Sequence, residues 1–279
     1  MISHMILDPF LQRALEEDIG TGDITTLSTI EEHRIAHGRY IAKGNGILCG
    51  IEVAQRVFAL LDPTIVLTPN KKDGDFVEKG EIIATVTGPA INVLTGERVG
   101  LNLMQHLSGI ATRTAEAVKS VAGYHAVIAD TRKTTPGMRV LEKYAVKVGG
   151  GSNHRFNLAD GVLIKDNHIA AAGSITAAVE RARKAIPHTL KIEVEVETKE
   201  QLEEALAVKA DIIMLDNMSC EAMAEAVKIV NGRAVTEASG NMGERNLAEV
   251  AATGVDIISI GALTHTVVPL DISLKFTLQ

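Results

Sequence analysis

The sequence is poor in the features that mark nucleic-acid-binding and membrane proteins. Tryptophan is absent, aromatic residues make up 3% of the chain, and the formal net charge is −7. Single-stranded nucleic acids are usually held by aromatic stacking and basic patches, and neither is present. No apolar run approaches the ~20 residues of a transmembrane helix. We therefore expect binding to neither nucleic acid nor membrane.

Cysteine is equally scarce, with only Cys49 and Cys220 far apart in the chain. The absence of CxxC and HExxH motifs argues against a thiolate or zincin metal site. A disulfide between them is compatible with the sequence, but two separate cysteines are more typical of buried thiols in a reducing compartment. The N-terminal stretch MISHMILDPF lacks the basic region and apolar core of a signal peptide, so we expect a cytoplasmic protein.

The 279 residues are enough for one large α/β domain or two moderate ones, and the 46% of apolar residues is ordinary for a globular core. Before about residue 120, the hydrophobic pattern alternates between helical and strand-like spacing without a regular repeat. Helical spacing predicts helices over 8–18, 51–61 and 91–121, and strand-and-turn patterns cover 34–50 and 73–89.

A regular alternation of strand and helix begins near residue 120. Amphipathic segments separate most of the strands, which predicts a parallel sheet with right-handed crossovers. Six strands are too few for the usual eight-stranded barrel, which leaves an incomplete barrel or a doubly wound sheet. The predicted strands are 126–130, 161–165, 191–197, 211–216, 234–239 and 256–261.

Polar residues or glycines end every one of these strands. Ligands of parallel α/β folds bind at the carboxyl ends of strands. The general polarity of loops explains one or two such ends, but not all six. In KIEVEVE (191–197), three glutamates alternate with apolar residues and share one face, where they need cationic partners or a metal ion.

Two sets of charges are expected to meet at these ends. Cations beside carboxylates fit a polyanionic ligand that carries Mg²⁺, such as a phosphate or pyrophosphate. The glycine turns SGN (239–241) and GAL (261–263) suit a phosphate monoester, which backbone N–H groups can bind. Taken singly, His154 is as often structural as functional. The cationic set is Arg132, Lys133, His154, Arg155 and Lys165, and the acidic set is Glu195 and Asp216.

The stretch TRKTTPGMRVLEKYAVKVGGGSNHRFNLADGVLIKDNHI (131–169) resembles the central signature of the quinolinate phosphoribosyltransferase family. The resemblance covers nearly the whole chain from about Leu7. It continues in EDIGTGDITT (17–26), GERVGLNLMQHLSGIAT (96–112), EVEVET (193–198), MLDN (214–217), EASGN (237–241) and residues 254–275.

The resemblance implies an enzyme that condenses quinolinate with phosphoribosyl pyrophosphate (PRPP) and uses Mg²⁺. It releases pyrophosphate and CO₂ and forms nicotinate mononucleotide for NAD synthesis. The implied fold is an N-terminal α/β sandwich (1–108, joined by 269–279) followed by an incomplete six-stranded α/β barrel (109–268). The implied assembly is a homodimer or a larger homo-oligomer with shared active sites.

The resemblance also implies roles for residues at matching positions. Arg98 would reach the neighbouring subunit's quinolinate, while Arg132, His154 and Arg155 would clamp its carboxylates, as the bidentate geometry of arginine suits. The implied catalytic residues are Lys133, Lys165, Glu195 and Asp216, with Mg²⁺ held by Glu195 and Asp216. The implied 5′-phosphate site consists of Ser239, Gly240, Asn241 and Gly261, with Ala262 and His265 also binding substrate.

Three alternatives remain at this stage. A barrel lyase or aldolase could form a Schiff base on Lys165, although phosphate and carboxylate binding explains all the cations together. A carrier module could use residues 73–89 as a biotinyl- or lipoyl-type hairpin, but its modified lysine is missing. A relative could use another substrate, as in a molybdenum-associated pyrophosphorylase-like protein or a nicotinate-using enzyme. The complete cationic set favours a dicarboxylate.

Overall fold

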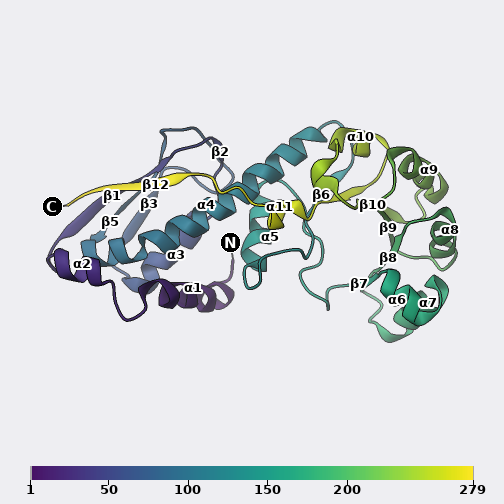
Figure 1. Cartoon of the computed structure of the whole chain (residues 1–279), viewed down its shortest axis with the longest axis horizontal. Helices are drawn as coiled ribbons and strands as arrows, with labels where there is room; N and C mark the ends of the chain where they lie inside the picture. The colour runs from purple at the N-terminus through teal and green to yellow at the C-terminus, as the bar shows by residue number, and fades with distance from the viewer. Residues whose placement is uncertain (1, 279) are drawn as a thin grey trace. The chain divides into compact units, whose positions relative to one another are not determined.

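The computed structural model describes the chain from Ile2 to Leu278 and divides it into two compact units (Figure 1). The first unit contains Met1–Ala115, Pro136–Gly150 and Thr266–Gln279, and the second contains Glu116–Thr135 and Gly151–His265. No helix within the described residues is both long and apolar enough to cross a membrane.

The first unit is built on a four-stranded antiparallel sheet with the order β12-β1-β5-β3. Tyr40, Phe58 and Met104 are buried in its core. The strand β12 comes from the end of the chain and pairs along the whole of β1. The strands are β1 (Ile35–Ala42), β3 (Val66–Pro69), β5 (Ile82–Pro89) and β12 (Ile272–Leu278), and the helices are α1 (His4–Ile19), α2 (Ile24–Thr29), α3 (Ile51–Leu61) and α4 (Ala90–Ser120).

Residues 73–89 do not form the hairpin that a carrier module requires. The strand β4 (Phe76–Val77) pairs with β2 (Gly46–Ile47), whereas β5 pairs with β1 and β3. Asp73, which precedes β4, accepts hydrogen bonds from the N–H groups of Gly50 and Ile51 at the start of α3. The hairpin interpretation is therefore wrong, because the two strands belong to different sheets.

The second unit contains the six expected strands in one parallel sheet with the order β6-β11-β10-β9-β8-β7. The strands are β6 (Val127–Ala129), β7 (Val162–Ile164), β8 (Ile192–Val196), β9 (Ile212–Asp216), β10 (Val235–Ser239) and β11 (Ile257–Ser259). The helices are α6 (Asp166–Ala172), α7 (Ile175–Ala185), α8 (Lys199–Ala207), α9 (Cys220–Val230), α10 (Leu247–Ala252) and α11 (Ala262–His265), with a short 3₁₀ turn η1 (Met242–Glu244).

Local sequence explains where four of the crossover helices begin. The side chains of Ser174, Thr198, Ser219 and Asn246 each accept a hydrogen bond from a backbone N–H in the first turn of the following helix. Such caps satisfy N–H groups that have no partner inside the helix. In Figure 1 the helices α7 to α10 follow the outer side of the curved sheet. After each of these helices the chain runs back to the sheet, so that the next strand lies parallel to the preceding one.

The sheet is an incomplete barrel, because its edge strands β6 and β7 pair with one neighbour each. The segment after the three glycines lies beside β6, where Ser152 forms a parallel bridge with Ala129. Ser152 N donates to Ile128 O at 2.8 Å, and Asp130 N donates to Ser152 O at 3.1 Å. This short pairing places the following residues, 153–155, near the carboxyl end of β6.

Helix α5 (Arg139–Val148) belongs to the first unit, although the expected boundaries place it in the barrel domain. Its contacts explain this. Tyr144 Oη donates to Asp73 Oδ2 at 2.8 Å, and His106 Nε2 lies 2.9 Å from Glu142 Oε1. The helix ends before Gly149, and Gly150 has a φ of +90°, a left-handed conformation that glycine adopts without cost.

We expect Gly149→Ala to lower the free energy of unfolding by about 1–3 kcal/mol, the usual cost of overpacking. A Cβ atom at this position would lie 2.6 Å from Thr114 Cβ and also meet the carbonyl oxygen of Ala111 on α4. Gly161→Ala is the matched control, since its Cβ would meet nothing closer than Lys191 O at 3.8 Å. Urea unfolding of the two variants measures the difference, and equal stabilities would contradict this packing.

Candidate functional site

A cavity of about 590 Å³ lies at the carboxyl ends of the parallel strands. It is lined by the segments that follow β6, β7 and β10 and by the last residues of β8 and β9. Most of the site residues expected from the sequence meet here. They are Arg132, Lys133, His154, Arg155, Lys165, Glu195, Asp216, Ser239, Gly240 and Asn241.

The remaining expected residues are placed elsewhere. A Cβ atom on Gly261 would lie 3.0 Å from Lys133 Cδ and 3.2 Å from the His265 ring, so this turn packs beside Lys133. Thr264 Oγ1 donates to Lys133 O at 2.8 Å. The turn at Gly261 and Thr264 therefore supports the lysine segment, and substrate binding by Gly261, Ala262 and His265 stays a prediction from the sequence. Arg98 lies on α4 in the first unit with an exposed side chain.

Two guanidinium groups line this cavity, and the charge of Arg132 acts on Arg155 more strongly than the charge of either Glu193 or Asp160. The Nε atom of Arg132 is buried and has no hydrogen-bond partner among the described residues. Burial and the charge of Arg132 lower the pKa of Arg155 from its ordinary value, although the group stays cationic. Arg155 Nη1 donates to Gly161 O at 3.0 Å, which holds its side chain across the site. Because a buried donor without a partner is costly, this pair is suited to an anionic ligand.

Carboxylates and a lysine form a second region of the cavity. Lys165 Nζ donates to Glu195 Oε2 at 2.6 Å, and Asn217 Nδ2 donates to Asp216 Oδ2 at 2.6 Å. A Schiff-base lysine must attack as the neutral amine, so its pairing with Glu195 argues against the aldolase interpretation. Glu195 and Asp216 present the hard oxygen ligands that Mg²⁺ prefers.

The SGN turn (239–241) at the end of β10 has a left-handed backbone. Gly240 has a φ of +93° and Asn241 a φ of +52°, both left-handed. A Cβ atom on Gly240 would lie 2.7 Å from Asn217 Cγ, so a larger residue does not fit here. Concave turns of this kind present backbone N–H groups to anions. The geometry is consistent with the phosphate site expected from the sequence.

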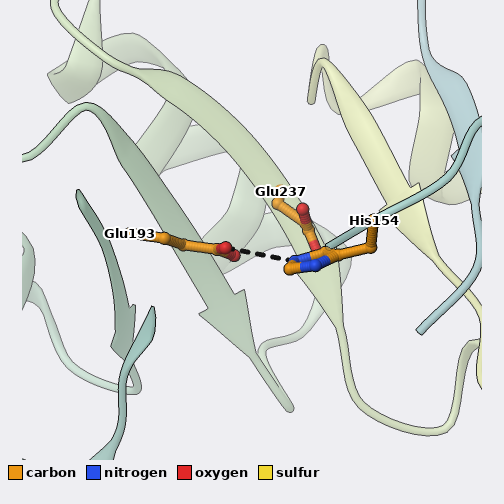
Figure 2. Close-up of side chains that lie close together, drawn as sticks. All are labelled: His154, Glu193 and Glu237. Atoms are coloured by element: carbon orange, nitrogen blue, oxygen red, sulfur yellow. Dashed lines mark ion pairs between the residues drawn. The ribbon is translucent and has the colours of Figure 1, made fainter. Parts of the chain in front are cut away.

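His154 and Glu237 in the cavity lining form a triad with the buried Glu193 (Figure 2). His154 Nε2 lies 3.1 Å from Glu193 Oε2 and 3.7 Å from Glu237 Oε1. Burial, with the charge of Glu193, raises the pKa of Glu237 to about 7. The two glutamates are absent from the site expected by sequence. The shared face of KIEVEVE pointed to Glu193, but only the fold brings it to His154.

Comparisons with known proteins cover almost the whole chain. The family model described as "Quinolinate phosphoribosyl transferase, C-terminal domain" matches residues 110–275, and the model of the N-terminal domain matches 23–108. A Bacillus subtilis (strain 168) protein named as a probable carboxylating nicotinate-nucleotide pyrophosphorylase is 50% identical over 278 residues. The alignment covers 100% of this chain and 96% of that protein.

Solved structures agree with these sequence matches. NadC from Streptococcus pyogenes is similar with a TM-score of 0.94 and 42% identity, over 100% of this chain and 98% of that chain. The nicotinate-nucleotide pyrophosphorylase from Francisella tularensis has a TM-score of 0.95 and 41% identity, over 99% and 98% of the two chains.

The buried carboxyl of Glu237 predicts a pH-dependent stability. With its pKa raised from 4.5 to about 7, the folded protein holds this proton more tightly than the unfolded chain does. The free energy of unfolding therefore falls as the pH rises from 4.5 to 7, by up to about 3 kcal/mol.

Glu237→Gln removes this group, so we expect the variant to gain stability relative to the parent protein as the pH rises. Urea unfolding at about pH 5 and about pH 8 measures the change. Glu204→Gln on α8 is the control, because Glu204 accepts hydrogen bonds from Thr176 away from the cavity. The prediction is wrong if parent and Glu237→Gln lose stability in parallel.

Proposed function

The chain belongs to the quinolinate phosphoribosyltransferase family, and we propose that the cavity at the carboxyl ends of its six parallel strands is where quinolinate and PRPP react. The chain is a carboxylating nicotinate-nucleotide pyrophosphorylase of NAD biosynthesis. The observation that carries the assignment of the site is the pair of guanidinium groups, Arg132 and Arg155, which line one cavity and include a buried Nε–H with no hydrogen-bond partner among the described residues.

Quinolinate suits this pair because it bears two adjacent carboxylates. Arg132 would donate its unpartnered Nε–H to one carboxylate, and Arg155 would take the other. Each charge-assisted contact contributes about 1.5–3 kcal/mol. Nicotinate, with one carboxylate, would leave one guanidinium unbalanced, so the pair favours the dicarboxylate. His154 lies under this clamp, adjacent in the chain to Arg155.

The second region of the cavity would bind PRPP. Lys133 and Lys165 would neutralise pyrophosphate oxygens, and Ser239, Gly240 and Asn241 would bind the 5′-phosphate through the left-handed turn. We propose that Glu195 and Asp216 hold Mg²⁺ with the pyrophosphate, directly or through water. When bound, the ion supplies positive charge to the leaving group.

The reaction then needs little proton transfer. The pyridine nitrogen attacks the anomeric carbon, the bond to pyrophosphate breaks, and the ribosyl carbon gains oxocarbenium character. The lysines stabilise the charge that develops on the departing pyrophosphate. The nitrogen is now cationic, so the adjacent carboxylate can leave as CO₂ and its electron pair is stabilised on the ring carbon, which then takes a proton. Tight pairing of this carboxylate in the ground state would oppose its loss.

We further propose a homodimer in which Arg98 completes the site of the partner copy. Arg98 is exposed, and within residues 2–278 its side chain forms no ion pair or hydrogen bond. Glu97 beside it has a pKa raised by burial, against the opposing charge of Arg98. Pairing with Glu97 is the simpler explanation of the arginine, but the two side chains form no salt bridge here. A cytoplasmic location stays a prediction from the sequence.

We expect the purified protein to form nicotinate mononucleotide and CO₂ from quinolinate and PRPP, and far less product from nicotinate and PRPP. In Arg155→Ala, quinolinate affinity should fall about ten- to a hundredfold, with little change for PRPP. Calorimetry with each substrate measures this. Arg183→Ala is the control, since Arg183 pairs with Asp211 at 3.8 Å and does not line the cavity. Weaker PRPP binding with unchanged quinolinate affinity would contradict the clamp.

Subunit complementation tests Arg98. Chains carrying Arg98→Ala or Arg155→Ala should each be inactive alone and regain part of the activity after mixing and exchange. A mixed dimer holds one site with both arginines and one with neither. Activity measured on isolated heterodimers decides the question. If they show no recovery, Arg98 acts within its own chain or is structural.

A further inference from the structure

The triad places two carboxyl groups in the protein interior, although neither of them belongs to the arginine clamp. Glu193 lies on β8 and is 4% exposed, and Glu237 lies on β10 and is 1% exposed. Both side chains point toward His154 from strands that flank β9 (Figure 2). Carboxylates in such surroundings destabilise a fold unless they are paired. The group that both carboxyls approach is the ring of His154.

The hydrogen bonds of His154 determine where its ring proton lies. The backbone N–H of Arg155 donates to His154 Nδ1 at 2.8 Å. An atom that accepts a hydrogen bond carries no proton, so the proton of the neutral ring lies on Nε2. Nε2 is the atom that faces both glutamates, at 3.1 Å and 3.7 Å. Glu193 Oε2 therefore acts as the acceptor for the Nε2–H group, whereas Glu237 Oε1, at 3.7 Å, lies beyond hydrogen-bond distance and acts on the ring through its charge.

This arrangement links the glutamates to the clamp. His154 N donates to Asp130 Oδ1 at 2.8 Å, which anchors the backbone on one side of the ring. His154 Nδ1 in turn accepts a hydrogen bond from the backbone N–H of Arg155, and the Arg155 guanidinium donates a hydrogen bond to Gly161 O. A ring flip would remove the acceptor from the Arg155 amide. It would also place a different ring edge toward the glutamates.

A metal ion is the competing explanation, since one nitrogen and two carboxylate oxygens lie within 4.8 Å of one another. A metal requires an unprotonated ligand atom. Nε2 is the nitrogen that faces both carboxylates, and it carries the proton as long as Nδ1 accepts from Arg155. The hydrogen bonds of His154 thus favour a proton on Nε2, facing the two carboxyl groups, over a metal ion bound at that position.

We propose that Glu193 and Glu237 are positioning residues that hold His154 as its Nε2–H tautomer and thereby fix Arg155 in the quinolinate clamp. The proposal rests on the proposed function for its kinetic consequence, but its structural part concerns the ring of His154 alone. Glu193 carries most of the effect, because its oxygen is the closer acceptor. Neither glutamate needs to touch the substrate.

The test compares Glu193→Leu, Glu193→Gln and the double variant Glu193→Leu/Glu237→Leu. Leucine has a similar size and no acceptor, so it removes the contact together with a buried charge. Glutamine keeps a carbonyl oxygen that can accept the Nε2–H, and it should restore the parent behaviour. Glu204→Gln, a glutamate of the same unit outside the cavity, is the control.

Nitrogen NMR of protein labelled at histidine nitrogens gives the first measurement, with His154 assigned through His154→Gln. We expect the parent protein and Glu193→Gln to show an Nε2–H tautomer, and the double variant to show averaging of the two tautomers. An Nδ1–H tautomer in the parent would overturn the proposal. So would a stoichiometric metal ion whose removal by a chelator changes the His154 signals.

Steady-state kinetics give the second measurement. We expect the KM for quinolinate to rise about tenfold in Glu193→Leu and the double variant, while the KM for PRPP changes less than about twofold. An unchanged quinolinate KM in folded variants would overturn the proposal, and so would an equal rise for both substrates. If the parent protein makes no nicotinate mononucleotide, the proposed function fails, and the NMR measurement still decides the role of the glutamates.

Discussion

The site depends on the positive charges of Arg132 and Arg155, which the fold holds together in one cavity. Arg132 and Arg155 are brought together in a partly enclosed cavity, where water screens them poorly and a buried Nε–H has no acceptor. Such a pair costs free energy in the absence of ligand, and an anion with two acceptor groups removes that cost. A ligand with two adjacent carboxylates would therefore offset the free-energy cost of holding the two cations close together.

The surrounding structure keeps the guanidinium groups from relaxing. The bridge between Ser152 and Ala129 fixes the segment that carries His154 and Arg155, and Asp130 accepts from the His154 amide. Glu195, by contrast, is already paired with Lys165 at 2.6 Å. The two regions of the cavity thus differ in kind. One presents two guanidinium groups, while the other holds carboxylates and a cation that already pair with one another.

Much of the fold could be predicted from the sequence, because its signals are local. Each of the six apolar runs became a strand, and residues such as Ser174 and Thr198 mark helix starts through their own side chains. The ends of the strands then indicated the cavity, since parallel strands share one carboxyl edge. The supposed hairpin at 73–89 failed for the opposite reason. A sequence of two short strands joined by glycines does not determine which strands they pair with. In the structure β4 pairs with β2, and β5 pairs with β1 in a different sheet.

The sequence by itself determined the residue types at the carboxyl ends of the strands, and with them the family and its chemistry. Only the tertiary structure decided which of these residues meet. Glu193 and Glu237, which are far apart in the sequence, converge on His154 from strands separated by β9. The physical reason is distance along the chain. Strand and helix periodicity is set by neighbouring residues, whereas the partner of a buried carboxyl is set by the strand order and curvature of the whole sheet.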